Sequence, residues 1–287
     1  MKKITRQKRV AAIHDISGFG KCSLTVALPI LSAAGIEAAA LPTAVLSTHT
    51  GGISGFTYRD LTDDIRPFTE HWYSLGLHFD AIYSGFLGSF EQLDLVGEFF
   101  DKFKTDDNLI LVDPVMADNG EMYKIFTPDF AAGMANLCRK ADILVPNITE
   151  AAFLLGETYK EGPYSKAFVE GLLKKLSEQL NVNKIVLTGV FFDEKELGAA
   201  TYDRTTGVVD YILAPRIPGY YHGTGDVFGS ALLSGLLNGF SLSDSAGIAV
   251  RYTTESIKRT FEAKTDIRFG VDFERSIPNF LKDLNLL

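Results

Sequence analysis

The sequence is poor in cysteine and has no long apolar run, and these two shortages exclude whole classes of protein. Only Cys22 and Cys138 occur among the 287 residues, far apart and without the spacing of metal ligands. We therefore expect reduced thiols in a cytoplasmic protein rather than a disulfide framework. No stretch reaches the roughly 18 apolar residues of a membrane span, and we recognise no signal peptide.

Basic charge is also in short supply. The chain has 28 Lys and Arg against 36 Asp and Glu, a formal net charge of -8. This balance argues against nucleic acid or an anionic membrane as a partner, because no basic surplus exists to neutralise phosphates. The main basic cluster contains Lys2, Lys3, Arg6, Lys8 and Arg9. We expect it to be solvated and residues 1–8 to form a flexible tail.

Short apolar runs alternate with longer stretches of helical period, which predicts an α/β fold with a mostly parallel sheet covered on both faces. The expected strands are 9–14, 36–42, 81–86, 109–114, 143–146 and 184–190, then a hairpin of 198–202 and 208–213. The main expected helices are 21–34, one from the turn at 223–226 to 238, and 244–261. No linker or repeat divides the chain, so we expect a single domain over residues 1–287.

The most informative segment is the turn Gly223-Thr224-Gly225-Asp226. Glycines allow the backbone to point several N–H groups inward, and the first turn of a helix adds unpaired N–H groups at its positive end. This combination predicts an anion hole for the phosphates of a nucleotide. A carboxylate beside phosphate is unusual, so Asp226 is either a general base for phosphoryl transfer or a helix cap.

Two other nucleotide motifs are excluded. Gly18 and Gly20 follow the first expected strand, but Ser23 stands where a dinucleotide motif needs its third glycine. A P-loop needs glycine at position 15 and serine or threonine at position 22, where this chain has Asp15 and Cys22.

Further polar residues follow other expected strands, at the sheet edge where open α/β folds bind ligands. Asp113 and Asp118 leave one strand, and Asn147 and Glu150 leave the next. The remaining candidates at strand ends are Asp15, Ser17, His49, Thr50, Phe86, Val145, Thr188 and Ala214. Several have ordinary alternatives: Glu150 could be a first-turn acid, Asp113 a turn residue and His49 a buried, satisfied histidine.

Together these segments resemble the ribokinase superfamily and, within it, the pyridoxal (vitamin B6) kinases. The similarity runs from about Val10 to Phe261 and includes the glycine–aspartate turn at 223–226, the Asn-x-x-Glu motif at 147–150, the aspartates of 113–118, the segment 47–51 and the strand end at 83–88. It implies a three-layer α/β/α ribokinase-like fold, a kinase that uses ATP and Mg²⁺, and a homodimer. A monovalent cation is a further candidate cofactor.

The resemblance also implies roles for individual residues. Asp226 becomes the base that deprotonates the 5′-hydroxymethyl group of a B6 vitamer, and Gly223, Thr224 and Gly225 form the anion hole. The implied ATP-binding residues are Asp113, Val145, Asn147, Glu150, Thr188 and Ala214. The implied metal ligands are Asp118 and Glu150. The implied substrate-binding residues are Asp15, Ser17, His49, Thr50, Phe86 and Asp226.

The chain departs from the B6 kinase pattern at two positions. Many pyridoxal kinases carry serine where Asp15 stands and tyrosine where Phe86 stands. Asp15 and Ser17 instead resemble a motif of the hydroxymethylpyrimidine kinases of thiamine synthesis. That kinase activity and a non-catalytic vitamer-binding protein are therefore the alternatives to a B6 kinase.

Overall fold

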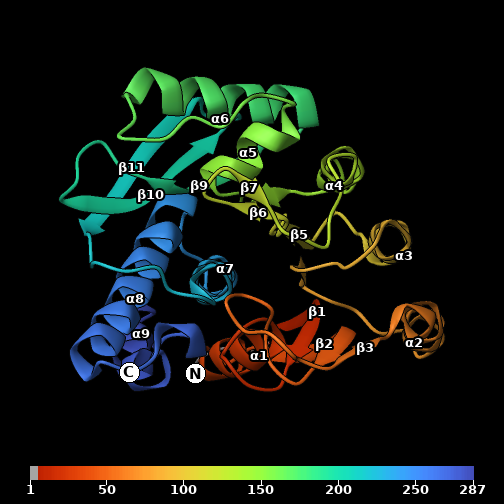
Figure 1. Ribbon diagram of the computed structural model, residues 1–287. Helices are drawn as coiled ribbons and strands as arrows, with labels where there is room; N and C mark the ends of the chain where they lie inside the picture. Colours follow the sequence, from red (N-terminus) through yellow and green to blue (C-terminus); the bar gives the residue numbers. More distant parts are fainter. Residues whose placement is uncertain (1–5) are drawn as a thin grey trace, which may run out of the picture.

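The computed structural model of the protein describes residues 6–287 and centres on one sheet of 9 strands (Figure 1). Its strand order is β11-β10-β9-β8-β5-β4-β1-β2-β3. The bounds are β1 (Arg9–Ser17), β2 (Glu37–Leu46), β3 (Tyr58–Asp60), β4 (Ala81–Ser84), β5 (Leu109–Val112), β8 (Ile143–Leu144), β9 (Lys184–Val190), β10 (Glu196–Asp203) and β11 (Val208–Pro215). Six strands from β2 to β9 are parallel neighbours, and β3, β10 and β11 are added antiparallel at the edges. The predicted, mostly parallel sheet is confirmed.

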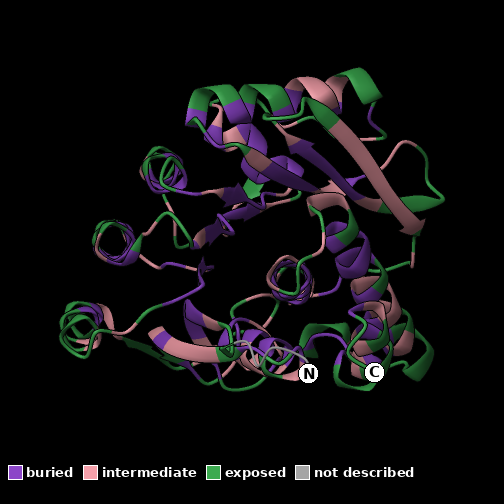
Figure 2. Cartoon of the chain, turned by 180° about the vertical axis from the view of Figure 1, so that it is seen from behind, coloured by how far each residue is buried: buried purple, intermediate pink, exposed green. Residues whose placement is uncertain are grey.

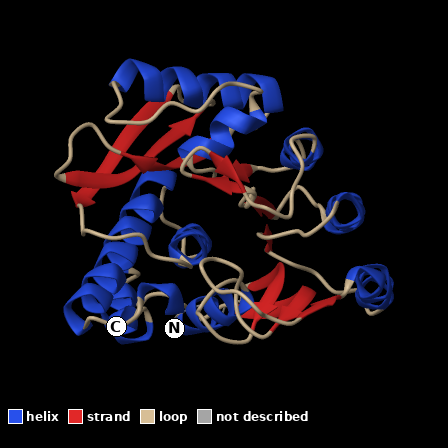
Figure 3. Cartoon of the chain, viewed as in Figure 1, coloured by secondary structure: helices blue, strands red, loops and turns tan. Residues whose placement is uncertain are grey.

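Helices cover both faces of this sheet, which gives the predicted three layers (Figure 3). One face is covered by α2 (Thr62–Ser74), α3 (Phe90–Phe103), α4 (Phe130–Cys138), α5 (Ile148–Leu154) and α6 (Lys166–Leu180). The other is covered by α1 (Leu24–Ala33), α7 (Thr224–Leu237), α8 (Leu242–Ala263) and α9 (Ile277–Asp283). Within residues 6–287, none of the helices has both the length and the apolar character needed to cross a membrane.

Two hydrophobic cores lie on opposite sides of the sheet. Successive strand residues point to opposite faces, so Val10 of β1 packs in the core under α1 and α7, while its neighbour Ala11 packs under α2 and α3. In β4, Ala81 and Tyr83 belong to the first core and Ile82 to the second. Figure 2 shows the central strands buried between partly exposed helices, whereas the edge strands β3 and β11 are more exposed. The continuous apolar runs of the sequence follow from burial on both faces.

The loop between β1 and α1 is longer than the sequence predicts. We expected a helix from residue 21, but Lys21 has a φ of 55° and Ser23 a φ of 59°. Both values lie in the left-handed region, so α1 begins at Leu24. The reason is tertiary, because this loop packs against the turn at Gly223.

A short hairpin of β6 (Ala117–Asp118) and β7 (Glu121–Met122) was not predicted. Its two-residue turn is Asn119-Gly120, with φ values of 50° and 80°. Asn-Gly is a strong hairpin signal because both turn residues need positive φ. The sequence therefore contained the signal, but the strands are only two residues each.

Arg6 and Lys8 are solvated, as expected, and they also bind one buried carboxylate. Their side chains are 59% and 52% exposed. The Arg6 guanidinium donates two hydrogen bonds of 2.9 Å to the Asp80 carboxylate, and Lys8 donates one of 3.1 Å. The Arg9 backbone N–H adds a bond of 2.8 Å. Asp80, just before β4, thus ties this segment to the sheet, and the flexibility of residues 1–8 stays a prediction, of which residues 1–5 lie outside the described part.

We expect Asp80→Ala to lower the free energy of unfolding by about 1–3 kcal/mol at neutral pH. Burial by itself raises the pKa of Asp80, but the Arg9 N–H and the Lys8 ammonium outweigh it and hold the pKa below its usual value. A lowered folded-state pKa stabilises the fold above the unfolded pKa, and this contribution disappears as the pH falls through the folded pKa. The difference between wild type and variant should therefore shrink in acid, as measured by urea unfolding.

Asp101→Ala is the matched control, because Asp101 also pairs with a lysine but its side chain is 66% exposed. Its effect should stay below about 0.5 kcal/mol. Equal losses of unfolding free energy in the two variants would contradict a structural role for Asp80 and its partners Arg6, Lys8 and Arg9.

Candidate active site

The turn before α7 presents free N–H groups at the carboxyl edge of the sheet. Gly223 is the N-cap of α7 and has a φ of 74°. A Cβ at this glycine would overlap the carbonyl oxygen of Lys21. Thr224 donates its hydroxyl to the carbonyl of Tyr221 at 3.2 Å, which fixes the side chain and leaves the helix N-terminus to a ligand. The turn thus lies where the sequence predicted it, at the start of a helix, and its role as an anion hole stays a prediction.

Asp226 lies in the first turn of α7 with its side chain 14% exposed. Burial raises the pKa of this carboxyl to about 7; the Ser23 backbone N–H lowers it, and the negative charge of Asp15 raises it further. A carboxyl with a pKa near 7 is matched to accepting a proton at neutral pH. Asp226 does not cap the helix, because Gly223 is the cap residue and no side chain caps it, but Asp226 does supply an acidic charge to the first turn, which is the ordinary alternative to a base.

Asp15 approaches the same site from the end of β1. Ser17 donates its hydroxyl to one Asp15 oxygen at 2.9 Å, and Ser23 donates to the other at 2.5 Å. Burial raises the pKa of Asp15, and the two serine hydroxyls oppose this shift. Ser17 therefore orients Asp15, and its own hydroxyl hydrogen is used in doing so.

Asp113 follows β5 and lies beneath the start of α7. A Cβ built on Gly225 would be 3.8 Å from the Asp113 Oδ2 atom. Burial, and then the charge of Asp226, raises the pKa of Asp113 well above its usual value. The structure thus brings Asp113, Asp226 and the glycine turn together, as predicted.

Asn147 and Glu150 form a capping box at the N-terminus of α5. The Asn147 side chain accepts from the Glu150 N–H at 2.9 Å, and Glu150 accepts from the Asn147 N–H at 2.9 Å. The other Glu150 oxygen accepts from the Met116 N–H at 3.2 Å. Glu150 is therefore a first-turn acid of α5, as the ordinary alternative had it. The roles of Asn147 and Glu150 in ATP binding, and of Glu150 in metal binding, stay predictions.

Asp118 lies on the β6–β7 hairpin, and its hydrogen-bond partners differ from those of Glu150. Its Oδ2 atom accepts from the Tyr220 hydroxyl at 2.6 Å, and its Oδ1 atom accepts from the Asn119 N–H at 2.8 Å. Tyr220 precedes the glycine turn, so the hairpin is tied to the segment leading into α7.

The predicted nucleotide residues Val145, Thr188 and Ala214 follow the sheet toward its β11 edge. Val145 is buried, and Thr188 donates weakly to the Pro146 carbonyl at 3.4 Å. Ala214 lies near the end of β11, which runs in the same direction as β9. All three therefore lie at the carboxyl edge, and Ala214 is the most remote from Asp113 in strand order.

The predicted substrate residues His49, Thr50 and Phe86 lie on the other side of Asp15. His49 donates from Nε2 to the Arg268 carbonyl at 2.5 Å and accepts at Nδ1 from the Gly51 N–H at 3.0 Å. Both nitrogens are therefore used within the protein, and only the ring face or edge is left for a ligand. Thr50 is exposed, and Phe86 is half-buried against Phe126 with ring centroids 5.8 Å apart.

Sequence reasoning missed three residues around this site. His14 is buried beneath Asp226, His222 lies with its ring 5.0 Å from that of His49, and Tyr220 binds Asp118. Tyr220 and His222 come directly before the glycine turn in the sequence, which was a usable signal. For His14 the sequence offers no signal beyond its position next to Asp15.

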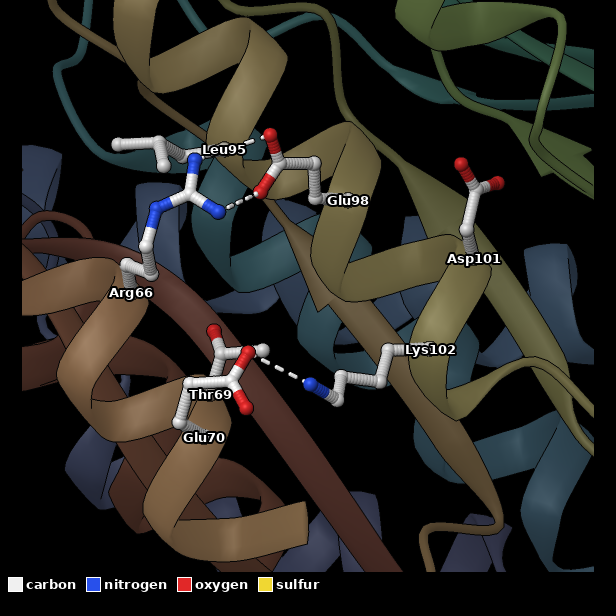
Figure 4. Close-up of a pocket in the computed structure, with 7 residues that line it drawn as sticks. All are labelled: Arg66, Thr69, Glu70, Leu95, Glu98, Asp101 and Lys102. Atoms are coloured by element: carbon white, nitrogen blue, oxygen red, sulfur yellow. Dashed lines mark hydrogen bonds and ion pairs between the residues drawn. The ribbon is translucent and has the colours of Figure 1, made fainter.

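A hollow of about 410 Å³ between α2 and α3 lies elsewhere (Figure 4). Its polar side chains pair with one another: Arg66 with Glu98 at 2.6 Å and Lys102 with Glu70 at 2.6 Å. None of the predicted site residues lines it. Because its charges are already neutralised, it is not a candidate active site.

The oxygen-rich edge around Asp113 fits Mg²⁺. Among residues 6–287 no group of three His, Cys, Asp or Glu side chains could hold a metal by itself. Mg²⁺ needs no such cage, since it usually keeps several waters and takes one or two carboxylates plus substrate phosphates. Burial and the nearby Asp113 raise the pKa of Glu150, so these carboxyls resist being ionised together, and a bound cation would favour their charged forms.

The chain shares this architecture with known kinases. A family model described as phosphomethylpyrimidine kinase matches residues 28–269. A protein of Bacteroides thetaiotaomicron, solved with pyridoxal as a candidate phosphomethylpyrimidine kinase, is 37% identical with a TM-score of 0.91 over 96% of both chains. Pyridoxal kinase from Lactobacillus plantarum is 32% identical with a TM-score of 0.87 over 97% of this chain and 98% of that one.

A curated relative, the pyridoxal kinase of Dictyostelium discoideum, is 28% identical over 187 residues, which are 60% of this chain and 57% of that protein. The chain thus spans little more than half the length of this relative. The solved structures, by contrast, match nearly end to end.

We expect Gly223→Ala to lower kcat/KM at least about tenfold, because a side chain there meets the Lys21 carbonyl and displaces the N–H groups. Gly156→Ala is a matched control: its φ is 67°, and its surroundings leave room for a Cβ. The control should lose about 1 kcal/mol of stability from backbone strain and keep its turnover. Equal turnover in the two variants would contradict the anion-hole assignment.

Proposed function

This chain belongs to the phosphomethylpyrimidine kinase family, and we propose that it transfers the γ-phosphoryl group of ATP to the 5′-hydroxymethyl group of pyridoxal, pyridoxine or pyridoxamine. The observation that carries the proposal is a buried carboxyl, Asp226, with a pKa raised to about 7 by burial, in the first turn of a helix whose glycine N-cap supports an anion hole. A carboxylate placed at a phosphate site is explained by proton abstraction, which a binding protein would not need.

The proposed reaction needs little covalent chemistry from the protein. The substrate oxygen forms a bond to the γ-phosphorus while the bond to the β,γ-bridging oxygen breaks and ADP leaves. The hydroxyl proton moves to the Asp226 carboxylate. The N–H groups of Gly223, Thr224 and Gly225 stabilise the charge on the transferring group, and the strand ends hold both reactants in line.

We propose Mg²⁺ as the cofactor, held by Asp118, Glu150 and the phosphates of ATP. When bound, it would neutralise phosphate charge. Asp113 adds negative charge to the same edge, and Asn147 orients Glu150 through the capping box. A monovalent cation, homodimeric assembly and a cytoplasmic location stay predictions that rest on the resemblance to B6 kinases.

Two features of the substrate side favour a B6 vitamer. The structures that match the chain nearly end to end include a pyridoxal kinase and a protein solved with pyridoxal. The segment at 47–51 also resembles that of B6 kinases. The pyrimidine alternative is favoured by Asp15 and Ser17 and by the description of the matching family model. We propose that the Asp15 carboxylate accepts a hydrogen bond from a proton-bearing nitrogen of the substrate.

The test is phosphorylation by the purified protein with ATP and Mg²⁺, comparing the three vitamers with hydroxymethylpyrimidine. We expect turnover of at least one vitamer well above that of the pyrimidine. Asp226→Asn should lower kcat by about two orders of magnitude or more with nearly normal ATP binding, because the amide cannot accept the proton. Turnover of the pyrimidine alone would reject the vitamer assignment, and wild-type turnover in Asp226→Asn would reject the base.

Asp15→Ser tests the role of the second carboxylate. Loss of the negative charge should change the ratios of kcat/KM among pyridoxal, pyridoxamine and hydroxymethylpyrimidine, since the three differ in their nitrogen groups. Ser17→Ala, which leaves the charge in place, should change the ratios much less. Unchanged ratios in Asp15→Ser would rule out this role.

A further inference from the structure

A histidine that the proposed reaction does not use lies directly behind its base. His14 belongs to β1, its side chain is fully buried, and its Nδ1 atom is 3.9 Å from the Asp226 Oδ1 atom. Neither ring nitrogen has a hydrogen-bond partner among residues 6–287. Buried polar atoms are normally paired, so an unpaired imidazole in a core next to a carboxylate calls for an explanation.

The surrounding residues hold the His14 ring in this position. The ring packs edge-on against Tyr83 of β4, with centroids 4.3 Å apart. A Cβ on Gly85 would overlap the His14 Nδ1 atom, so the absence of a side chain at Gly85 leaves room for the ring. The ring can shift little, whereas Asp226 lies at a helix start and can approach it. A contact of 3.9 Å in a protein without substrate is of the kind that tightens in the reactive complex.

The charge state of the pair decides what His14 can do. Burial lowers the pKa of His14 to about 3, so the ring is neutral at every working pH and does not take up the substrate proton. A neutral imidazole has one N–H group, on either Nδ1 or Nε2. A carboxylate facing Nδ1 favours the form with hydrogen on Nδ1, because the other form would turn a lone pair toward the negative oxygen.

The other titratable groups around Asp226 do not supply this donor. Asp15 on β1 and Asp113 after β5 are carboxyls. Cys22 in the loop after β1 and Tyr83 on β4 keep their hydrogens, because burial and the charge of Asp226 raise the pKa of both. Neither donates to Asp226: the Cys22 thiol donates to the Gly20 carbonyl at 3.8 Å, and the Tyr83 hydroxyl has no hydrogen-bond partner among residues 6–287. Ser23 acts through its backbone N–H. His14 is therefore the side-chain N–H positioned behind the carboxylate.

We propose that His14 is a positioning residue for Asp226: its Nδ1–H group donates to Oδ1, holds the carboxylate ionised and leaves Oδ2 free to take the substrate proton. This inference rests on the proposed function. Its consequence is that the acid side of the pH profile reports the His14–Asp226 contact as well as Asp226 itself.

The experiment compares kcat and KM between about pH 5 and 9 for wild type, His14→Leu and His14→Asn. In His14→Leu the acid limb of kcat/KM should move up by about half a pH unit or more and kcat should fall about tenfold, because the carboxylate loses its donor. KM for ATP should change less than about twofold. His14→Asn keeps an amide near the Nδ1 position. It should return both the acid limb and kcat most of the way to their wild-type values.

Tyr83→Phe is the matched control, since it removes a buried hydroxyl beside His14 and leaves the imidazole in place. Its acid limb should coincide with that of wild type. A limb that stays fixed in His14→Leu, or that moves equally in Tyr83→Phe, would overturn the proposal. A wild type without kinase activity would instead reject the proposed function.

A second measurement does not depend on activity or on a stable variant. NMR of ¹⁵N-labelled histidine in the wild-type protein, which has 5 histidines, distinguishes the two neutral forms. His14 should show hydrogen on Nδ1 and no titration between about pH 5 and 9. Hydrogen on Nε2, or a titration in this range, would also overturn the proposal.

Discussion

Gly223 lies against the carbonyl oxygen of Lys21, and this contact sets the distance between the start of α7 and the loop after β1. The loop reaches it only by taking left-handed backbone angles at Lys21 and Ser23. Ser23 in turn binds Asp15 and faces Asp226. The glycine turn, Asp226 and Asp15 are therefore placed by one close approach between backbones, which only a glycine allows.

The close approach between these two backbone segments also brings acidic side chains together. Asp15, Asp113, Glu150 and Asp226 all have raised pKa values, with burial as the main cause. Asp15 is supported by two serine hydroxyls and Glu150 by two backbone N–H groups. Asp113 receives no such side-chain support among the residues described. Burial thus opposes ionising these carboxyls together, and a bound cation would favour their charged forms.

Much of this could be predicted from the sequence, for identifiable reasons. The strand at 184–190 was predicted with the bounds that β9 has, because strands buried on both faces give continuous apolar runs. The residues at strand ends followed, since parallel strands deliver them to one edge. The placement of Asp226 beside Asp15 and Asp113 was therefore predictable from sheet topology.

What could not be predicted depends on contacts between distant segments. The delayed start of α1 reflects the contact of Lys21 with Gly223, and the binding of Arg6 depends on Asp80 just before β4. His14 looks like any strand residue until Gly85 and α7 are placed around it. The capping box was visible as a spacing, but the spacing alone could not decide between a helix end and a metal site.

The contact between Lys21 and Gly223 also has a meaning for biosynthesis. A ribosome releases the loop after β1 early and α7 late, so the growing chain can pair β1 with β2 and β4 while the loop has no turn to pack against. The turn at Gly223 can pack against this loop only when α7 has emerged. A chain that stops before α7 would carry most of the sheet and Asp15 but neither Gly223 nor Asp226, so the proposed site assembles late in translation.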